Sequence, residues 1–194
     1  MSTPITRPAF LLALMFAGGM SFGQTTAATT KQEDEFARKR PETKLVEVIT
    51  TDSLPPDALM KRAVAWIKEE SPKYRKSSGT TTGTKAECTA SFPVKPKELN
   101  PEVDYTGKIT MKVVIECKNS RYRYTVSDIR HESKNGRTTA GSIDNEVPEC
   151  GSVNMHDQIW KKLRGEALRN AALVVADIKL GMSQDPIEIN DDEW

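Results

Sequence analysis

Apolar residues recur at every second position through two neighbouring segments of this chain, residues 108–117 and 121–127. A period of two with a single apolar face indicates antiparallel strands that are covered on one side only. Lys118-Asn119-Ser120 between them is a short turn, so the segments are expected to pair. The apolar set of the first is Ile109, Met111, Val113, Ile115 and Cys117, and that of the second is Tyr122, Tyr124 and Val126.

The stretch RYRYTV that opens the second segment has a composition that could suit nucleic-acid binding, because bases stack on tyrosines and arginines pair with phosphates. Strand alternation separates these groups, since Tyr122 and Tyr124 take one face while Arg121 and Arg123 take the other. Burial of both rings removes roughly 300 to 500 Å² from water, which is enough to fix the register. The stretch is therefore predicted to be an amphipathic strand.

Further strands are expected on both sides of this pair. Residues 45–50 (LVEVIT) are rich in β-branched side chains. Residues 85–92 alternate with the apolar set Ala86, Cys88, Ala90 and Phe92. Asn135-Gly136 favours a hairpin followed by a weaker strand over 138–143. Residues 77–84 (SSGTTTGT) contain only Gly, Ser and Thr and predict a flexible loop.

Two helices are predicted. The first begins at the prolines of Ser53-Leu54-Pro55-Pro56-Asp57, since proline is tolerated in the first helical turn. It ends near Glu70, because Pro72 disfavours helical geometry at the residue before it. The second runs from about Asn154 to Leu180, with Gly181 as the expected stop. Its apolar stripe is Met155, Ile159, Trp160, Leu163, Ala167, Ala171, Val174, Val175 and Ile178.

The expected order is thus β-α-β(3–4)-α. Both helices carry one apolar stripe, and such stripes normally pack against a sheet. The fold class is therefore α+β, with an antiparallel sheet and two helices on one of its faces.

The chain begins with the features of a secretory signal peptide. Arg7 supplies a positive charge, residues 9–17 (AFLLALMFA) form a short apolar run, and Ser21 and Gly23 are small residues at the −3 and −1 positions before Gln24. Residues 1–23 are thus expected to be removed on export, leaving a periplasmic or secreted protein without a stable membrane span. The expected organisation is a disordered lead-in over 24–43, a domain over 44–181 and an acidic flexible tail over 182–194.

Charge balance argues against a nucleic-acid partner. The chain has 28 Lys and Arg against 27 Asp and Glu, and removal of residues 1–23 takes away only Arg7, which leaves 27 against 27. A protein that binds nucleic acid gains affinity by neutralising several phosphates with clustered basic residues. No nucleic-acid partner is therefore expected.

Three cysteines, Cys88, Cys117 and Cys150, fit no zinc pattern. An oxidising compartment permits one disulfide, either Cys88 with Cys117 or one that includes Cys150. The other interpretation leaves all three reduced, with Cys88 and Cys117 acting as small apolar residues in the sheet core.

Few residues suggest chemistry. His131-Glu132-Ser133-Lys134-Asn135 begins like a zinc-protease motif but has Asn135 where the second histidine belongs, and His156 fits a solvated helix start. Tyr74 with Lys73, Arg75 and Lys76 is the most surface-like candidate, although a solvated loop flank explains it better. No catalytic residue, cofactor or metal site is predicted.

Residues 61–67 (KRAVAWI) and 107–129 (GKITMKVVIECKNSRYRYTVSDI), together with the element order, resemble a family of exported bacterial proteins of unknown function with a TATA-binding-protein-like (TBP-like) fold. The likeness covers about residues 45–180. It implies the fold and an envelope setting, and it carries over no catalytic residue. It does not imply DNA binding, because a fold does not dictate function.

Similar β-α-β4-α folds, including the plant-allergen and lipid-transfer type, enclose an apolar cavity between a curved sheet and a long C-terminal helix. By that likeness the expected cavity wall is Met111, Tyr122, Tyr124, Trp160 and Leu163. The expected function is a non-enzymatic binding module for an apolar small molecule or an envelope partner protein. The alternatives are a hydrolase of an unrecorded type and a purely structural envelope protein.

Overall fold

The computed structural model describes residues 41–77, 79–96 and 103–184. The signal peptide, residues 24–40 of the lead-in and residues 185–194 of the tail lie outside the described residues. The elements in chain order are β1 (Leu45–Thr50), α1 (Pro56–Lys68), β2 (Arg75–Lys76), β3 (Thr80–Thr82), β4 (Lys85–Val94), β5 (Gly107–Lys118), β6 (Arg121–Ser133), β7 (Gly141–Ser142), α2 (Gly151–Asn154) and α3 (Asp157–Ser183).

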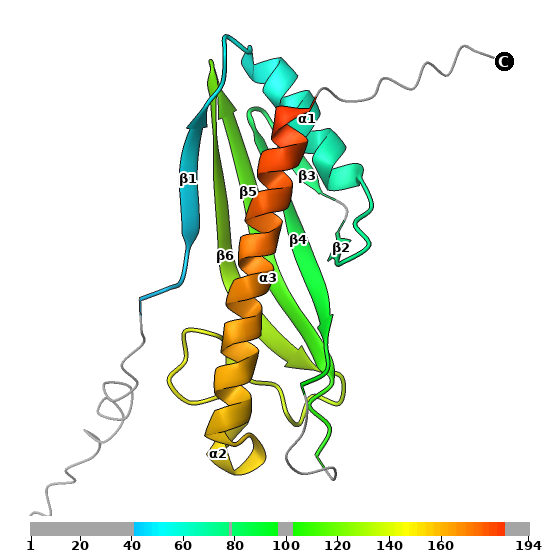
Figure 1. The fold of residues 1–194 in the computed structure, drawn as a ribbon, viewed down its shortest axis with the longest axis vertical. Helices are drawn as coiled ribbons and strands as arrows, with labels where there is room; N and C mark the ends of the chain where they lie inside the picture. The colour runs from blue at the N-terminus through cyan, green and yellow to red at the C-terminus, as the bar shows by residue number, and fades with distance from the viewer. Residues whose placement is uncertain (1–40, 78, 97–102, 185–194) are drawn as a thin grey trace, which may run out of the picture. The chain divides into compact units, whose positions relative to one another are not determined.

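One antiparallel sheet carries the fold. Its strands lie in the order β1-β6-β5-β4-β2, while β3 also pairs with β4 and β7 with β6. The helices α1 and α3 pack against each other and cover the same face, with α3 over β6 and α1 over β4 and β5 (Figure 1). The predicted α+β class, an antiparallel sheet with two helices on one face, is confirmed.

The core lies between this face and the two helices. The alternating sets of β4, β5 and β6 all point into it, and Tyr122 and Tyr124 are each only 3% exposed. Arg121 and Arg123 are exposed on the opposite face, which we call the outer face. The prediction that RYRYTV is an amphipathic strand is therefore correct.

A bulge in β6 changes which residues of this strand face the core. Before it the even-numbered residues from Tyr122 to Val126 are buried, and after it Ile129 and His131 are buried instead. The register shifts between Thr110 and Lys112 of β5, and Asp128 on the facing strand has a φ of 48°. Aspartate tolerates this left-handed conformation better than most residues. One extra residue thus keeps both ends of β6 in the core.

Several boundaries differ from the prediction. Residues 80–82 form a short strand rather than loop, because their β-branched threonines pair with β4 across a turn at Gly83. The strand expected over 138–143 reduces to β7, two residues long. The long helix begins at Asp157, since residues 151–154 form the separate turn α2.

The C-terminal helix also ends later than expected. It continues through Gly181 to Ser183, and Met182, assigned to the tail by sequence, is only 1% exposed. The reason is packing: a Cβ atom at position 181 would lie 2.6 Å from Cδ1 of Trp66 on α1. Glycine is required there by the approach of the two helices and does not act as a cap. Among the described residues, no helix combines the length and apolar character needed to cross a membrane.

Candidate functional site

The five residues proposed as a cavity wall all lie in the core. Met111 is fully buried, Leu163 is 1% exposed, and Tyr122, Tyr124 and Trp160 are each 3% exposed. Trp160 also donates from Nε1 to the backbone oxygen of Glu146 at 3.3 Å. Three hollows at the surface have volumes of about 310, 500 and 120 Å³, and Tyr124, Trp160 and Leu163 line none of them. In this structure the five side chains form part of the packed core between sheet and helices.

The three hollows lie in different parts of the fold. The first, of about 310 Å³, lies over the outer face of β4, β5 and β6. The second, of about 500 Å³, lies between the end of α1 and the segment that leads into β2. The third, of about 120 Å³, lies beside β1, where it is lined by Val48, Glu116, Lys118, Arg121, Tyr122 and Arg123.

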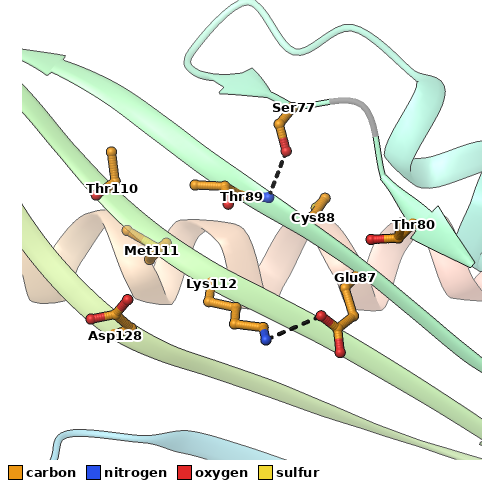
Figure 2. A pocket seen from close by; sticks show the side chains of 9 residues that line it. All are labelled: Ser77, Thr80, Glu87, Cys88, Thr89, Thr110, Met111, Lys112 and Asp128. Atoms are coloured by element: carbon orange, nitrogen blue, oxygen red, sulfur yellow. Dashed lines mark hydrogen bonds and ion pairs between the residues drawn. The ribbon is translucent and has the colours of Figure 1, made fainter.

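The first of these, which we call the outer-face hollow, is built by residues from four strands and one loop. Figure 2 views it from the side of the sheet opposite α3. Strand alternation places Glu87 and Thr89 of β4 beside Thr110 and Lys112 of β5, because Glu87 faces Val114 and Thr89 faces Lys112 in the register. The remaining lining residues are Ser77, Thr80, Cys88, Met111 and Asp128.

Two features close the sides of the outer-face hollow. On the β4 side, the Ser77 hydroxyl accepts the backbone N–H of Thr89 at 2.9 Å, which holds the segment before β3 against the sheet. On the β6 side, the bulge turns Asp128 toward solvent, with its carboxylate 3.9 Å from the guanidinium of Arg130. The floor is the sheet itself, since Cys88 and Met111 point into the core.

Charge in the outer-face hollow centres on Glu87. Its carboxylate forms ion pairs with Lys85 and with Lys112, the latter at 3.1 Å. Hydrogen bonds from Lys85 first, and then from Lys112, lower the pKa of Glu87. Glu87 is therefore ionised near neutral pH and is a poor proton donor. The outer-face hollow thus presents hydroxyl groups, the carboxylates of Glu87 and Asp128, and the ammonium of Lys112, and these groups suit polar recognition.

The candidate basic cluster at residues 73–76 is divided by the fold. Lys73 and Arg75 are exposed, as expected of a loop flank, but Tyr74 is 3% exposed and stacks on Phe92 with ring centroids 4.7 Å apart. The Lys76 ammonium lies 4.4 Å from the centre of the Trp66 ring and donates to the Trp66 backbone oxygen. Desolvation lowers the pKa of Lys76.

Asp177 of α3 ties this cluster to the second helix. It accepts hydrogen bonds from the Tyr74 hydroxyl and from Nε1 of Trp66, the latter at 3.2 Å. Desolvation and this carboxylate raise the pKa of Tyr74. The cluster therefore holds together α1, α3 and the segment before β2. Its contacts stabilise the fold and do not form a binding or catalytic site.

The two histidines have different surroundings. His156 caps α3, since its Nδ1 accepts the backbone N–H of Gln158 at 3.3 Å, in agreement with the predicted solvated helix start. His131 is 1% exposed, and its Nδ1 accepts the backbone N–H of Ala140 at 3.3 Å. No group of three or more His, Cys, Asp or Glu side chains that could hold a metal occurs within the described ranges.

All three cysteines are free thiols in the structure, so neither disulfide left open by the sequence is present. Cys88 and Cys117 lie in the core, as their places in the alternating sets predicted. Burial raises the pKa of each to about 11, which leaves little thiolate at neutral pH. The structure thus places both as core residues.

Sequence reasoning did not find the outer-face hollow. Its principal charged residues come from three strands, and only the register of β4, β5 and β6 brings Glu87, Lys112 and Asp128 to one surface. The available signal was Asp128, a charged residue at a position that unbroken alternation from Tyr122 and Tyr124 would bury. That conflict indicates a bulge, and bulges often lie beside functional sites.

Comparison with known proteins relates the fold to two solved structures. One is a DUF4468 family protein from Bacteroides ovatus, with a TM-score of 0.52, 8% identity, and coverage of 77% of this chain and 94% of that one. The other is a TBP-like protein from Parabacteroides distasonis, with a TM-score of 0.49, 16% identity, and coverage of 74% and 94%. No family model and no curated protein matches the chain.

The resemblance read from the sequence named a family of unknown function with a TBP-like fold. The likeness to the DUF4468 family protein supports that prediction at the level of fold. Identities this low carry no information about activity, ligand or partner, because one fold hosts many functions.

Proposed function

We propose that this protein is a non-enzymatic binding module of the bacterial cell envelope that engages a partner protein through the outer-face hollow. The observation that carries the proposal is the lining of this hollow, in which hydroxyl groups surround the Glu87–Lys112 pair. Such a surface suits hydrogen bonds and ion pairs with a polar segment of another protein. The expected signal peptide supports the envelope setting.

The same observations favour a protein partner over an apolar small molecule. An apolar ligand needs a site lined mostly by hydrophobic side chains. The proposed wall residues pack in the core, and the outer-face hollow exposes charged and hydroxyl groups instead. The hydrolase alternative is less favoured, because Glu87 is held ionised and Cys88 is held protonated.

Two lysines of β5 allow a matched test. Lys112 pairs with Glu87 at 3.1 Å inside the outer-face hollow, and Lys108 pairs with Glu132 at 3.0 Å on the same face outside it. Both side chains are about half exposed. Lys112→Glu places two carboxylates together in the hollow, whereas Lys108→Glu makes the same change of charge beyond its boundary.

The experiment recovers wild type, K112E and K108E from the cell envelope of the native host without denaturation and measures each by native mass spectrometry. The proposal predicts a mass that corresponds to the chain plus a second polypeptide for wild type and K108E, and the bare chain for K112E. Equal retention of the partner by K112E contradicts the proposed site. An added mass of a few hundred daltons that organic solvent releases contradicts the protein partner and supports a small-molecule carrier.

A further inference from the structure

The outer edge of β1 is an open strand edge. β1 ends the sheet order and pairs only with β6, and no described strand lies on its other side (Figure 1). Thr51, which faces Ser120, donates its backbone N–H to the Ser120 carbonyl at 2.8 Å. Because hydrogen-bonding direction alternates along a strand, Val46, Val48 and Thr50 direct their N–H and C=O groups away from β6.

The two edges of the sheet differ in their protection. At the far edge, β4 is covered by the two-residue β2 and the three-residue β3, and it contains Pro93. Short edge strands and proline are devices that prevent unwanted strand pairing. β1 has six residues in continuous register with β6, without proline or a bulge. The chain thus protects one edge and leaves the other able to pair.

Exposed apolar side chains accompany this open edge. Val46 is 52% exposed and Val48 is 55% exposed, and both lie on the outer face. Val48 also borders the 120 Å³ hollow over β6. In an isolated monomer these valines and three pairs of backbone groups are solvated, so a strand that adds to β1 would gain a backbone ladder and apolar contacts together.

We infer that β1 pairs antiparallel with β1 of a second copy of this chain, with Val48 on the twofold axis. This register sets Val48 against Val48 of the other copy and Val46 against Thr50, all on the outer face. On the inner face it sets Glu47 against Ile49. Lys44, which forms an ion pair with Glu42 of its own chain at 2.9 Å, then lies near Asp52, which follows β1 of the other copy, at both ends of the ladder.

Charge disfavours the neighbouring register that is centred on Glu47. A twofold axis at Glu47 also satisfies the backbone, but it sets the two Glu47 carboxylates directly opposite each other. Like charges directly opposite destabilise a strand pair. Each Glu47 already accepts from Tyr124 and forms an ion pair with Lys179 at 2.7 Å, so neither carboxylate can turn away without losing these contacts.

The dimer has two consequences. An edge of six residues buries less area than a standard protein interface, so the association is expected to be weak and concentration-dependent. The twofold axis is perpendicular to the sheet, because antiparallel pairing that keeps each face continuous requires this orientation. Both outer-face hollows then open on the same side of one extended sheet, and the dimer presents two copies of the proposed binding surface.

Substitution of Val48, which lies on the proposed twofold axis, by charged residues tests the inference. Sedimentation equilibrium of the purified protein over a wide concentration range should show a monomer–dimer equilibrium for wild type. Val48→Lys and Val48→Glu each set like charges together on the axis and should weaken dimerisation at least about tenfold. An equimolar mixture of V48K and V48E should restore it as a heterodimer. Because Val48 is exposed and directs its N–H away from β6, each variant should fold.

The outcomes are decisive in each direction. Wild type that remains monomeric at every concentration, or V48K that dimerises like wild type, overturns the inference. A mixture that fails to form the heterodimer overturns the placement of Val48 on the axis. K112E, which tests the outer-face hollow, should dimerise as wild type does, so loss of the proposed partner and loss of the dimer are distinguished.

Discussion

Gly181 and Trp66 bring the two helices into direct contact: a Cβ atom at position 181 would lie 2.6 Å from Cδ1 of the Trp66 ring. Trp66 is 2% exposed, and its Nε1 is held by Asp177 at 3.2 Å, so the ring has little room to move. We expect Gly181→Ala to destabilise the protein by about 1–3 kcal/mol through overpacking, although alanine favours helix more than glycine does. Urea denaturation followed by circular dichroism measures the change.

Gly165, in the same helix, is the matched control. A Cβ atom there would meet only an atom of Arg169, at 3.6 Å, which is ordinary contact. Gly165→Ala should therefore stabilise the protein by up to about 1 kcal/mol through helix propensity alone. If G181A and G165A shift the urea midpoint in the same direction by similar amounts, the close contact of Gly181 with Trp66 does not limit the packing of the helices.

The spacing of apolar residues along the sequence correctly predicted which face of a single strand or helix is buried. The alternation of Tyr122 and Tyr124 with Arg121 and Arg123 identified the buried face of β6, because each side chain's direction follows from its own position. Helical spacing likewise predicted the buried stripe of α3. Gly181 was misread because a glycine near a helix end has two explanations, a cap or a close contact, and only the partner helix distinguishes them.

Features that depend on pairing between distant segments were missed. Thr80–Thr82 form a strand because they pair with β4, and their own composition does not reveal this pairing. The bulge at Asp128 reverses the alternation of β6, and its one local signal is a charged residue at a position that unbroken alternation would bury. The outer-face hollow requires the register of three strands and that bulge, so its residues could be recognised only after the sheet was assembled.

The hydroxyl of Tyr74 should contribute measurably to stability. Tyr74→Phe keeps the ring stack on Phe92 but removes the hydrogen bond to Asp177. We expect a loss of about 1–2 kcal/mol in the free energy of unfolding, since the acceptor is a carboxylate. The measurement is urea denaturation at neutral pH.

Tyr122→Phe provides the comparison for this loss. Tyr122 is as buried as Tyr74, and its hydroxyl makes no hydrogen bond to the described part of the chain. Removing that hydroxyl should change stability by less than Tyr74→Phe does. Equal losses in Y74F and Y122F would show that the bond between Tyr74 and Asp177 has no net stabilising effect.

The thiols should differ sharply in reactivity. Burial raises the pKa of Cys88 and Cys117 to about 11 and also raises the pKa of Cys150, but Cys150 is only half-buried and can be reached by a reagent. A thiol reagent at pH 8 should therefore modify one cysteine of the native protein quickly, and Cys150→Ser should abolish that fast reaction. Denaturant should release the other two. An intact mass two daltons below that of the reduced chain would instead establish a disulfide and contradict the structure.

His131 should make stability depend on pH between neutrality and mild acid. Its burial lowers its pKa below the ordinary value of 6.5, against opposing interactions with the Tyr105 backbone and the Glu132 carboxylate. The unfolded chain therefore binds the proton first as pH falls, and stability decreases from about pH 6.5 until the native histidine is also protonated, with a slope of at most about 1.4 kcal/mol per pH unit. Urea denaturation from pH 8 to pH 5 measures this slope. His131→Gln should flatten it, and an unchanged slope in H131Q would assign the pH dependence to another group.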